Sequence, residues 1–275
     1  MAVGDPIFRK SRKAPLVVFA SLLPALAPAP AGAGAWTPEA GHGEIIVATL
    51  FDRSNAGFDA AGRFTPTPSY RSEQASIYLD YGLADWLAAT VKPSLQNSAL
   101  GAPANQTFAG FGDSEIGVRG RVWKSDAAVI SVQALARVPT TAGAANASLG
   151  GSRSADFDLR LLGGKNFAVG ALPGFVDLSL GYRARGGAPP NEGRADLSLG
   201  LYLRPELMLL AQDFNVLSAP SSDPACPRWA QAKAQLSLVY ALNADWRAQI
   251  GGFATLAGVN AYREYGPLVA LWRRF

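Results

Sequence analysis

The chain has 275 residues, a formal net charge of +4 and hydrophobic residues at 49% of its positions. One histidine and one cysteine are too few for a His/Cys metal site or an internal disulfide. No apolar run is long enough to cross a bilayer as a helix. These counts exclude helical membrane proteins and disulfide-stapled or zinc-stapled domains.

A basic and then apolar N-terminal segment predicts a cleaved secretory signal peptide. Four basic residues between positions 9 and 13 precede the apolar run APLVVFASLLPALA, and the small residues PAPAGAGA follow it. Two Ala-x-Ala sites allow cleavage before Gly34 or before Trp36. We take Trp36, which assigns residues 1–35 to the signal and 36–275 to the mature chain. The mature net charge is then about +1, so a nucleic-acid partner loses its main support.

The mature chain alternates apolar and polar residues instead of keeping helical spacing. In YRSEQASIYLDY (70–81), for example, Ile77 and Leu79 alternate with Tyr78 and Asp80. About twelve segments alternate in this way: 43–52, 70–81, 86–96, 111–123, 127–138, 155–166, 174–185, 193–204, 207–216, 229–240, 246–256 and 263–275. Each is close to the roughly 9 to 11 residues that a tilted strand needs to cross a bilayer.

The predicted connections differ in length. Tight turns such as 82–85 and 124–126 alternate with longer segments such as 53–69, 97–110 and 139–154, which are rich in Gly, Pro, Asn, Ser and Ala. An even number of strands with short turns on one side and longer loops on the other is typical of outer-membrane barrels. We therefore expect an all-β fold, a twelve-stranded antiparallel transmembrane barrel in the outer membrane of a Gram-negative bacterium.

Aromatic residues mark the predicted strand ends. The turns YGLADW (81–86) and YALNADW (240–246) repeat one pattern, which places Tyr81 and Tyr240 at a membrane boundary. The chain ends in YGPLVALWRRF, whose terminal Phe275 is in phase with apolar residues of the last strand, although Arg273 interrupts that pattern. We expect Phe275 to be the assembly signal for the barrel insertion machinery, with outer-membrane lipid as the other partner. The alternative is a soluble periplasmic β protein with two ordinary hairpin turns.

Residues 110–123, GFGDSEIGVRGRVW, combine a Gly-x-Gly-Asp strand start with a basic strand end. With YGLADW before it and GFVDLSLGYR (174–183) after it, this segment resembles the outer-membrane family named for the meta pathway of phenol degradation (MetA-type). The resemblance implies a β-barrel with a transport role for apolar or aromatic solutes, and no catalytic residues to carry over. No helix follows the Gly-x-Gly-Asp motif, so it is not interpreted as a phosphate loop.

Enzymatic function has little support in the sequence. Hydrolytic barrels usually need a histidine as general base, and the only histidine, His42, precedes the first strand. Cys226 lies between prolines in a predicted loop, where an inert thiol is the simplest interpretation. We therefore expect no catalytic residues, no metal and no cofactor.

Charged residues on the inward face are the candidate functional site. We expect a ring near the loop side, and a second set lower in the lumen. The ring is Asp113, Glu115, Arg137, Asp156, Asp158, Arg183, Arg185, Arg194 and Asp196, and the lower set is Arg119, Arg121, Asp177 and Arg204. Acidic and basic strands alternate, which favours neighbouring pairs. These charges either select solutes or form a salt-bridge lattice that fills the lumen.

The function expected from these features is passage of small molecules, including apolar or aromatic solutes, through a narrow charged lumen. The inward Tyr78, Tyr202 and Trp272 either line a path for aromatic solutes or fill space. A small surplus of inward basic residues suggests a slight anion preference. The alternative from another class is a non-transporting structural or adhesion barrel whose outer loops bind a partner.

Overall fold

The computed structural model describes residues 34–139, 154–187, 189–223 and 226–275, and the regular elements among them are all strands. The strands in chain order are β1 (Gly43–Phe58), β2 (Phe64–Ala84), β3 (Leu87–Lys92), β4 (Ser94–Leu100), β5 (Gln106–Phe111), β6 (Ser114–Lys124), β7 (Ala128–Val138), β8 (Asp156–Val169), β9 (Leu172–Ala184), β10 (Glu192–Arg204), β11 (Leu207–Ser218), β12 (Ala230–Ala241), β13 (Trp246–Val259), β14 (Ala261–Tyr262) and β15 (Tyr265–Arg274). Within these ranges no helix is long and apolar enough to span a membrane. Nearly all of the predicted signal, residues 1–33, lies outside them.

Three pairs of strands combine into single crossings of the wall, which gives the predicted twelve-stranded antiparallel barrel. β3 and β4 meet at Pro93, which has no N–H for the ladder, although its carbonyl still accepts from the Ile77 N–H at 3.1 Å. β5 and β6 meet at residues 112–113, and β14 continues into β15. The fold class expected from the alternating sequence is confirmed.

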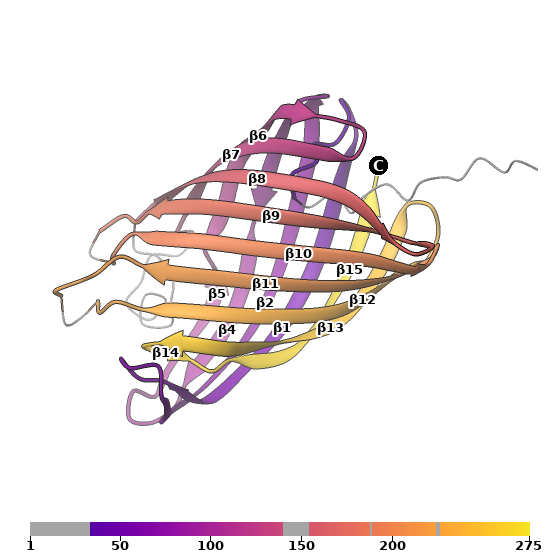
Figure 1. Cartoon of the computed structure of the whole chain (residues 1–275). Coiled ribbons are helices and arrows are strands. Elements are labelled where there is room, and N and C mark those ends of the chain that lie inside the picture. The colour runs from indigo at the N-terminus through magenta and orange to yellow at the C-terminus, as the bar shows by residue number, and fades with distance from the viewer. Residues whose placement is uncertain (1–33, 140–153, 188, 224–225) are drawn as a thin grey trace, which may run out of the picture.

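The first and last long strands of the chain pair with each other and so close the barrel. β1 pairs with β2 on one side and with β15 on the other, so Val47 lies opposite both Ile77 and Leu271. Gly43 and Phe275 exchange two backbone hydrogen bonds, of 2.8 and 3.0 Å. Figure 1 shows β8–β13 crossing in front of β1, β2, β4 and β5. A closed barrel leaves no free sheet edge along this seam.

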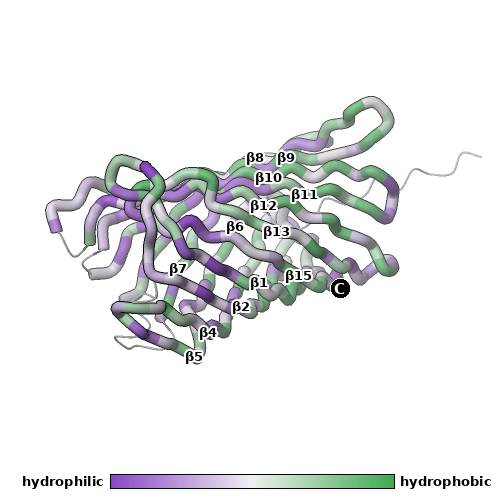
Figure 2. Tube along the Cα trace, turned by 90° about the horizontal axis from the view of Figure 1, so that it is seen from below, coloured by the Kyte–Doolittle hydropathy of each residue, from purple (hydrophilic) through white to green (hydrophobic). Residues whose placement is uncertain are grey.

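The two faces of the wall differ in chemistry, as the alternating colours along the strands in Figure 2 show. In β10, Leu197 and Leu199 point outward and are 42% and 41% exposed, whereas Asp196 and Ser198 point inward. Large exposed apolar side chains cover the same face of other strands, including Val47, Ile77, Leu159, Leu161, Leu178, Leu180, Leu236, Leu238, Ile250, Val269 and Leu271. An apolar belt of this extent requires lipid around it. The barrel therefore belongs in an outer membrane.

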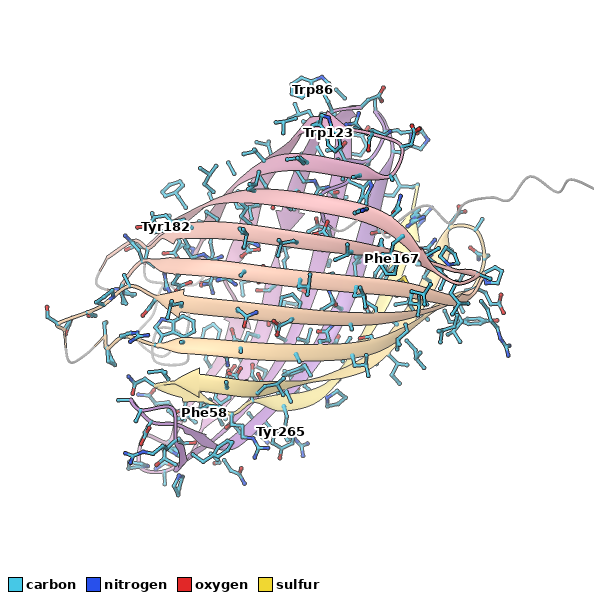
Figure 3. All side chains as sticks on the ribbon, in the orientation of Figure 1. Phe58, Trp86, Trp123, Phe167, Tyr182 and Tyr265 are labelled. Carbon is cyan, nitrogen blue, oxygen red and sulfur yellow. The ribbon has the colours of Figure 1, made fainter. Side chains whose placement is uncertain are left out.

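Aromatic side chains lie near both rims of this belt, and Figure 3 shows Trp86 and Trp123 near one rim and Tyr182 nearer the other. Tyr81 and Tyr240 lie on the outer face near the short turns. Tyr81 stacks on Phe275 with ring centroids 6.3 Å apart. This is the placement that the repeated turn pattern predicts, and anchoring at the membrane boundary stays a prediction.

Two predicted loops are much shorter than expected. The segment 53–69 is mostly strand, with only residues 59–63 between β1 and β2. The segment 97–110 likewise contracts to residues 101–105 between β4 and β5. The expected loop 139–154 lies almost wholly outside the described residues. Their loop-like composition did not predict strands, because these strands continue past the apolar belt. There, polar and small residues can take part in strand pairing as well as apolar ones.

Candidate functional site

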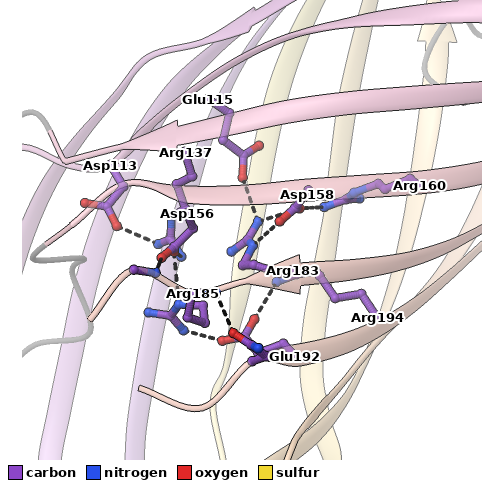
Figure 4. Close-up of polar contacts among 12 residues, drawn as sticks. Asp113, Glu115, Arg137, Asp156, Asp158, Arg160, Arg183, Arg185, Glu192 and Arg194 are labelled. Atoms are coloured by element: carbon purple, nitrogen blue, oxygen red, sulfur yellow. Dashed lines mark hydrogen bonds and ion pairs between the residues drawn. The ribbon is translucent and has the colours of Figure 1, made fainter. Parts of the chain in front are cut away.

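Charged side chains gather inside the barrel on five adjacent crossings, from β6 to β10 (Figure 4). We call this set the interior charge cluster: Asp113, Glu115, Arg137, Asp156, Asp158, Arg160, Arg183, Arg185, Glu192, Arg194 and Asp196. The period of two along each strand places alternate charged residues on the inner face. The cluster covers one side of the wall, so the expected ring is an arc.

Arg183 of β9 lies near the middle of this arc. Its Nε donates to Oδ1 of Asp158 at 2.5 Å, and its Nη2 donates to Oδ2 of the same carboxylate at 2.9 Å. Nη2 also lies 3.3 Å from Oε1 of Glu115 on β6. The Arg183 and Asp158 side chains are 3% and 2% exposed. This bidentate, dehydrated pair joins β8 to β9, and its second contact reaches across to β6.

Arg185 makes the second bridge of the arc, just after β9. Its Nε lies 3.0 Å from Oδ2 of Asp156, and its Nη1 bonds Oε1 of Glu192 at the start of β10. The Gly186 N–H donates to the other Asp156 oxygen at 2.9 Å, and the Arg185 N–H donates to Oδ1 of Asn191 at 2.9 Å. Backbone and side chain therefore hold this loop-side corner together.

The outer members of the arc complete the network. Arg137 Nη2 lies 2.9 Å from Oδ2 of Asp113. Arg160 bridges two strands, because its Nη2 donates to Asp158 at 2.8 Å and its Nη1 donates to Asp196 at 3.1 Å. Each of these five side chains is at most one-quarter exposed. On this side of the wall, salt bridges occupy space that an open pore would leave to water.

A second ionic pair lies closer to the short turns. Arg119 of β6 hydrogen-bonds Asp80 of β2, and both side chains are almost completely buried. Thr90 Oγ1 donates to the other Asp80 oxygen at 2.9 Å. Arg119 also donates to the carbonyl of Trp36 at 2.9 Å. The pair therefore links the wall to the start of the described chain.

The stretch before β1, residues 34–42, runs into the lumen from the turn side. We call it the N-terminal segment. The Ala35 N–H donates to Oδ2 of Asp177 at 2.5 Å, and Ser131 Oγ donates to the Ala35 carbonyl at 2.5 Å. Nearer the rim, Thr37 Oγ1 donates to the Asp85 carbonyl at 2.9 Å, and the Ala40 N–H donates to Asp85 Oδ1 at 3.0 Å. The segment is thus bonded at both of its ends.

Trp36 packs against an apolar group of inward-facing wall residues. The group is Phe175, Tyr202, Met208, Leu210, Val239 and Trp272, each at most 6% exposed. The Trp36 ring meets Phe175 edge-on with centroids 6.0 Å apart. On its other side it lies so close to Gly164 that a β-carbon there would fall 2.5 Å from the indole. We call this group, with Trp36, the aromatic constriction.

The predicted lower set of charges does not stay together. Arg119 and Asp177 both hold the N-terminal segment. Arg121 lies toward the short turn of β6, where its N–H donates to the Trp86 carbonyl at 2.7 Å. Arg204 was expected inside but is exposed, because a register shift after Tyr202 places it opposite Leu207 near the outer face. A bulge reverses the side to which later residues point, and alternation alone cannot locate one.

Sequence reasoning missed several inward charges. Glu192 is in phase with Arg194 and Asp196, and starting the strand one residue earlier would have found it. Glu44 and Asp52 on β1 and Arg274 on β15 also face inward. With these added and Arg204 removed, the expected surplus of basic residues disappears. The charge argument for an anion preference therefore does not hold.

Comparisons with known proteins agree with this architecture. No family model matches the sequence, and no curated protein sequence matches it significantly. An outer membrane channel from Pseudomonas putida F1 has a similar structure, with a TM-score of 0.69 at 13% identity over 88% of this chain and 98% of that one. The NanC porin follows with a TM-score of 0.53 at 10% identity, over 82% of this chain and 98% of that one. The translocator domain of the autotransporter NalP from Neisseria meningitidis has a TM-score of 0.50 at 14% identity, over 86% and 90% of the two chains. At these identities the likeness shows the fold, and the phenol-pathway family remains a resemblance.

Proposed function

We propose that the barrel passes small molecules through its interior, with the aromatic constriction as the narrowest point of the path. The observation that carries this proposal is the way the turn side of the lumen is occupied. There the N-terminal segment, which belongs to no strand of the wall, is bonded mainly through single hydrogen bonds. Displacing such a segment would open the path without breaking the wall.

The interior chemistry supports the same function. Replacing a buried ion pair by apolar residues of similar size is often neutral or stabilising, so rigidity alone does not call for the interior charge cluster. Charged side chains that face the lumen can instead interact with the polar groups of a solute that passes through it. A solute would leave this charged arc and meet Trp36, Phe175, Tyr202 and Trp272. We propose solutes with an aromatic or apolar part, in line with the resemblance to the phenol-pathway family.

A non-transporting structural barrel is the second candidate, and the depth of burial of the charges favours it. Asp156, Asp158, Arg183 and Glu192 are each at most 5% exposed, so they fill the loop side of the lumen tightly. In that case the same network would be a lattice that stiffens the wall. The two candidates differ in whether solute crosses the folded barrel.

Solute uptake by the reconstituted protein tests the proposal. Liposomes with the wild-type barrel should take up small aromatic solutes, and Trp36→Ala should raise both uptake and single-channel conductance because it removes the ring at the constriction. Trp86→Ala is the matched control, since Trp86 is 57% exposed outside the wall. If neither the wild type nor Trp36→Ala conducts, while both migrate as folded, heat-modifiable barrels, the structural candidate is correct.

A further inference from the structure

Asp177 of β9 is a buried carboxylate with no cation at ion-pair distance among the described residues. It points into the lumen and is 5% exposed. None of the salt bridges between described residues includes it. Among the described residues, the Ala35 N–H donates a hydrogen bond to it at 2.5 Å. A buried charge is costly unless it is paired, so this position calls for a positive group beside Ala35.

The residue before Ala35 lies directly against this carboxylate. A β-carbon placed on Gly34 would fall 2.3 Å from Asp177 Oδ2 and 2.6 Å from its Cγ. Gly34 also has a backbone φ of +141°, a value that residues other than glycine rarely adopt. The backbone of Gly34 therefore lies against Asp177, beside the Ala35 N–H that bonds to it. If the chain began here, its α-ammonium would lie next to the buried carboxylate.

Ala35 makes contacts inside the barrel that cleavage after it would remove. Ala35 is fully buried, and its carbonyl accepts from Ser131 Oγ at 2.5 Å. The Trp36 carbonyl accepts from Arg119 at 2.9 Å. Cleavage before Trp36 would remove the partners that Ala35 supplies to Asp177 and Ser131, two polar groups deep inside the wall. The contacts favour the earlier of the two cleavage sites.

We propose that the signal peptide is cleaved between Ala33 and Gly34, and that the new α-ammonium of Gly34 pairs with Asp177 inside the barrel. The Ala31-Gly-Ala33 sequence supplies the small residues that such a cleavage needs. Cleavage hydrolyses the Ala33–Gly34 peptide bond and leaves a carboxylate on the signal and an ammonium on the barrel. Processing thus creates the cation that neutralises a carboxylate already built into the lumen, and it adds one ion pair to the single hydrogen bonds that hold the N-terminal segment.

Intact-mass analysis and N-terminal sequencing of the protein purified from outer membranes test the cleavage site. The expected first residue is Gly34. A chain that starts at Trp36, lighter by one glycine and one alanine, overturns the proposal and restores the cleavage that the sequence pattern alone favoured.

The ion pair is tested by the reactivity of the terminal amine toward an amine-specific ester. In the folded wild type the amine of Gly34 should react at least about tenfold more slowly than in the urea-unfolded chain. Asp177→Asn keeps an acceptor for the Ala35 N–H but removes the charge, so it should restore most of the reactivity. The exposed Lys124 and Lys165 are internal controls and should react equally in both proteins.

Two outcomes contradict the pairing. If the terminal amine of the folded wild type reacts as fast as in the unfolded chain, the amine is not held in the lumen. If folded Asp177→Asn protects its amine as well as the wild type does, Asp177 is not its partner. The comparison of folded and unfolded wild type remains decisive even if the variant fails to fold.

Discussion

Arg183 and Asp158 face each other across β9 and β8 as register partners and join through two hydrogen bonds, of 2.5 and 2.9 Å. Arg185, two residues further on, makes the equivalent bridge from Asp156 to Glu192. These two arginines therefore neutralise most of the buried acid on the loop side of the lumen. Changing them tests whether the interior charge cluster controls the path.

Shortening both Arg183 and Arg185 to alanine should widen the loop side of the lumen and leave its carboxylates in excess. We expect higher single-channel conductance, a shift of selectivity toward cations and a lower melting temperature, because Asp156 and Asp158 lose partners. Planar-bilayer recordings under a salt gradient measure the first two. Arg63→Ala, which breaks an exposed loop pair, is the control. A folded double variant with wild-type conductance and selectivity would show that the arc is structural.

The pair of Arg119 and Asp80 provides a test of buried ionic energetics. Arg119→Ala should lower the free energy of unfolding by about 3–5 kcal/mol, because it leaves an unpaired carboxylate in the wall. Adding Asp80→Ala should recover part of that loss, since the uncompensated charge is then gone. Urea unfolding in lipid vesicles measures both. If adding Asp80→Ala lowers the free energy of unfolding further, the loss in Arg119→Ala does not come from the unpaired Asp80 carboxylate.

The lipid-facing assignment of β10 predicts a contrast between neighbouring positions. Leu199→Arg should cost about 2–4 kcal/mol, because it places a cation in the hydrocarbon layer. Ser198→Arg should cost much less, because its register partner on β9 is Asp177. The measurement is the free energy of unfolding, or the fraction of heat-modifiable barrel. Equal losses for the two substitutions would contradict the face assignment.

Phe275 should act as an assembly signal in addition to its packing role. Phe275→Ser should leave export intact and reduce the outer-membrane yield, although the variant keeps the backbone bonds to Gly43. Tyr81→Ala is the matched control, since it removes the ring that stacks on Phe275 and leaves the terminus unchanged. A similar yield for both variants would mean that Phe275 matters only through this contact.

The architecture of the wall could be predicted from the order of the residues alone. A strand period of two is a local property, so the alternation of Leu197, Ser198 and Leu199 shows which side faces lipid without knowledge of any neighbour. The number of crossings and the phase of Phe275 with the last strand follow from the same pattern. The order of neighbours was also predictable, since short turns force consecutive strands to pair.

The filling of the lumen could not be predicted, because it depends on contacts that form when the barrel closes. That Arg183 meets both Asp158 and Glu115 depends on register and on the distance across the wall, and Arg204 lies outside the interior because of a single bulge. The insertion of Ala35 and Trp36 into the lumen could not be predicted from the sequence, because an irregular segment has no periodic pattern of residues. Its position follows from contacts with Asp177, Ser131 and Arg119, on strands about 80 to 140 residues away, which come together only when the barrel closes.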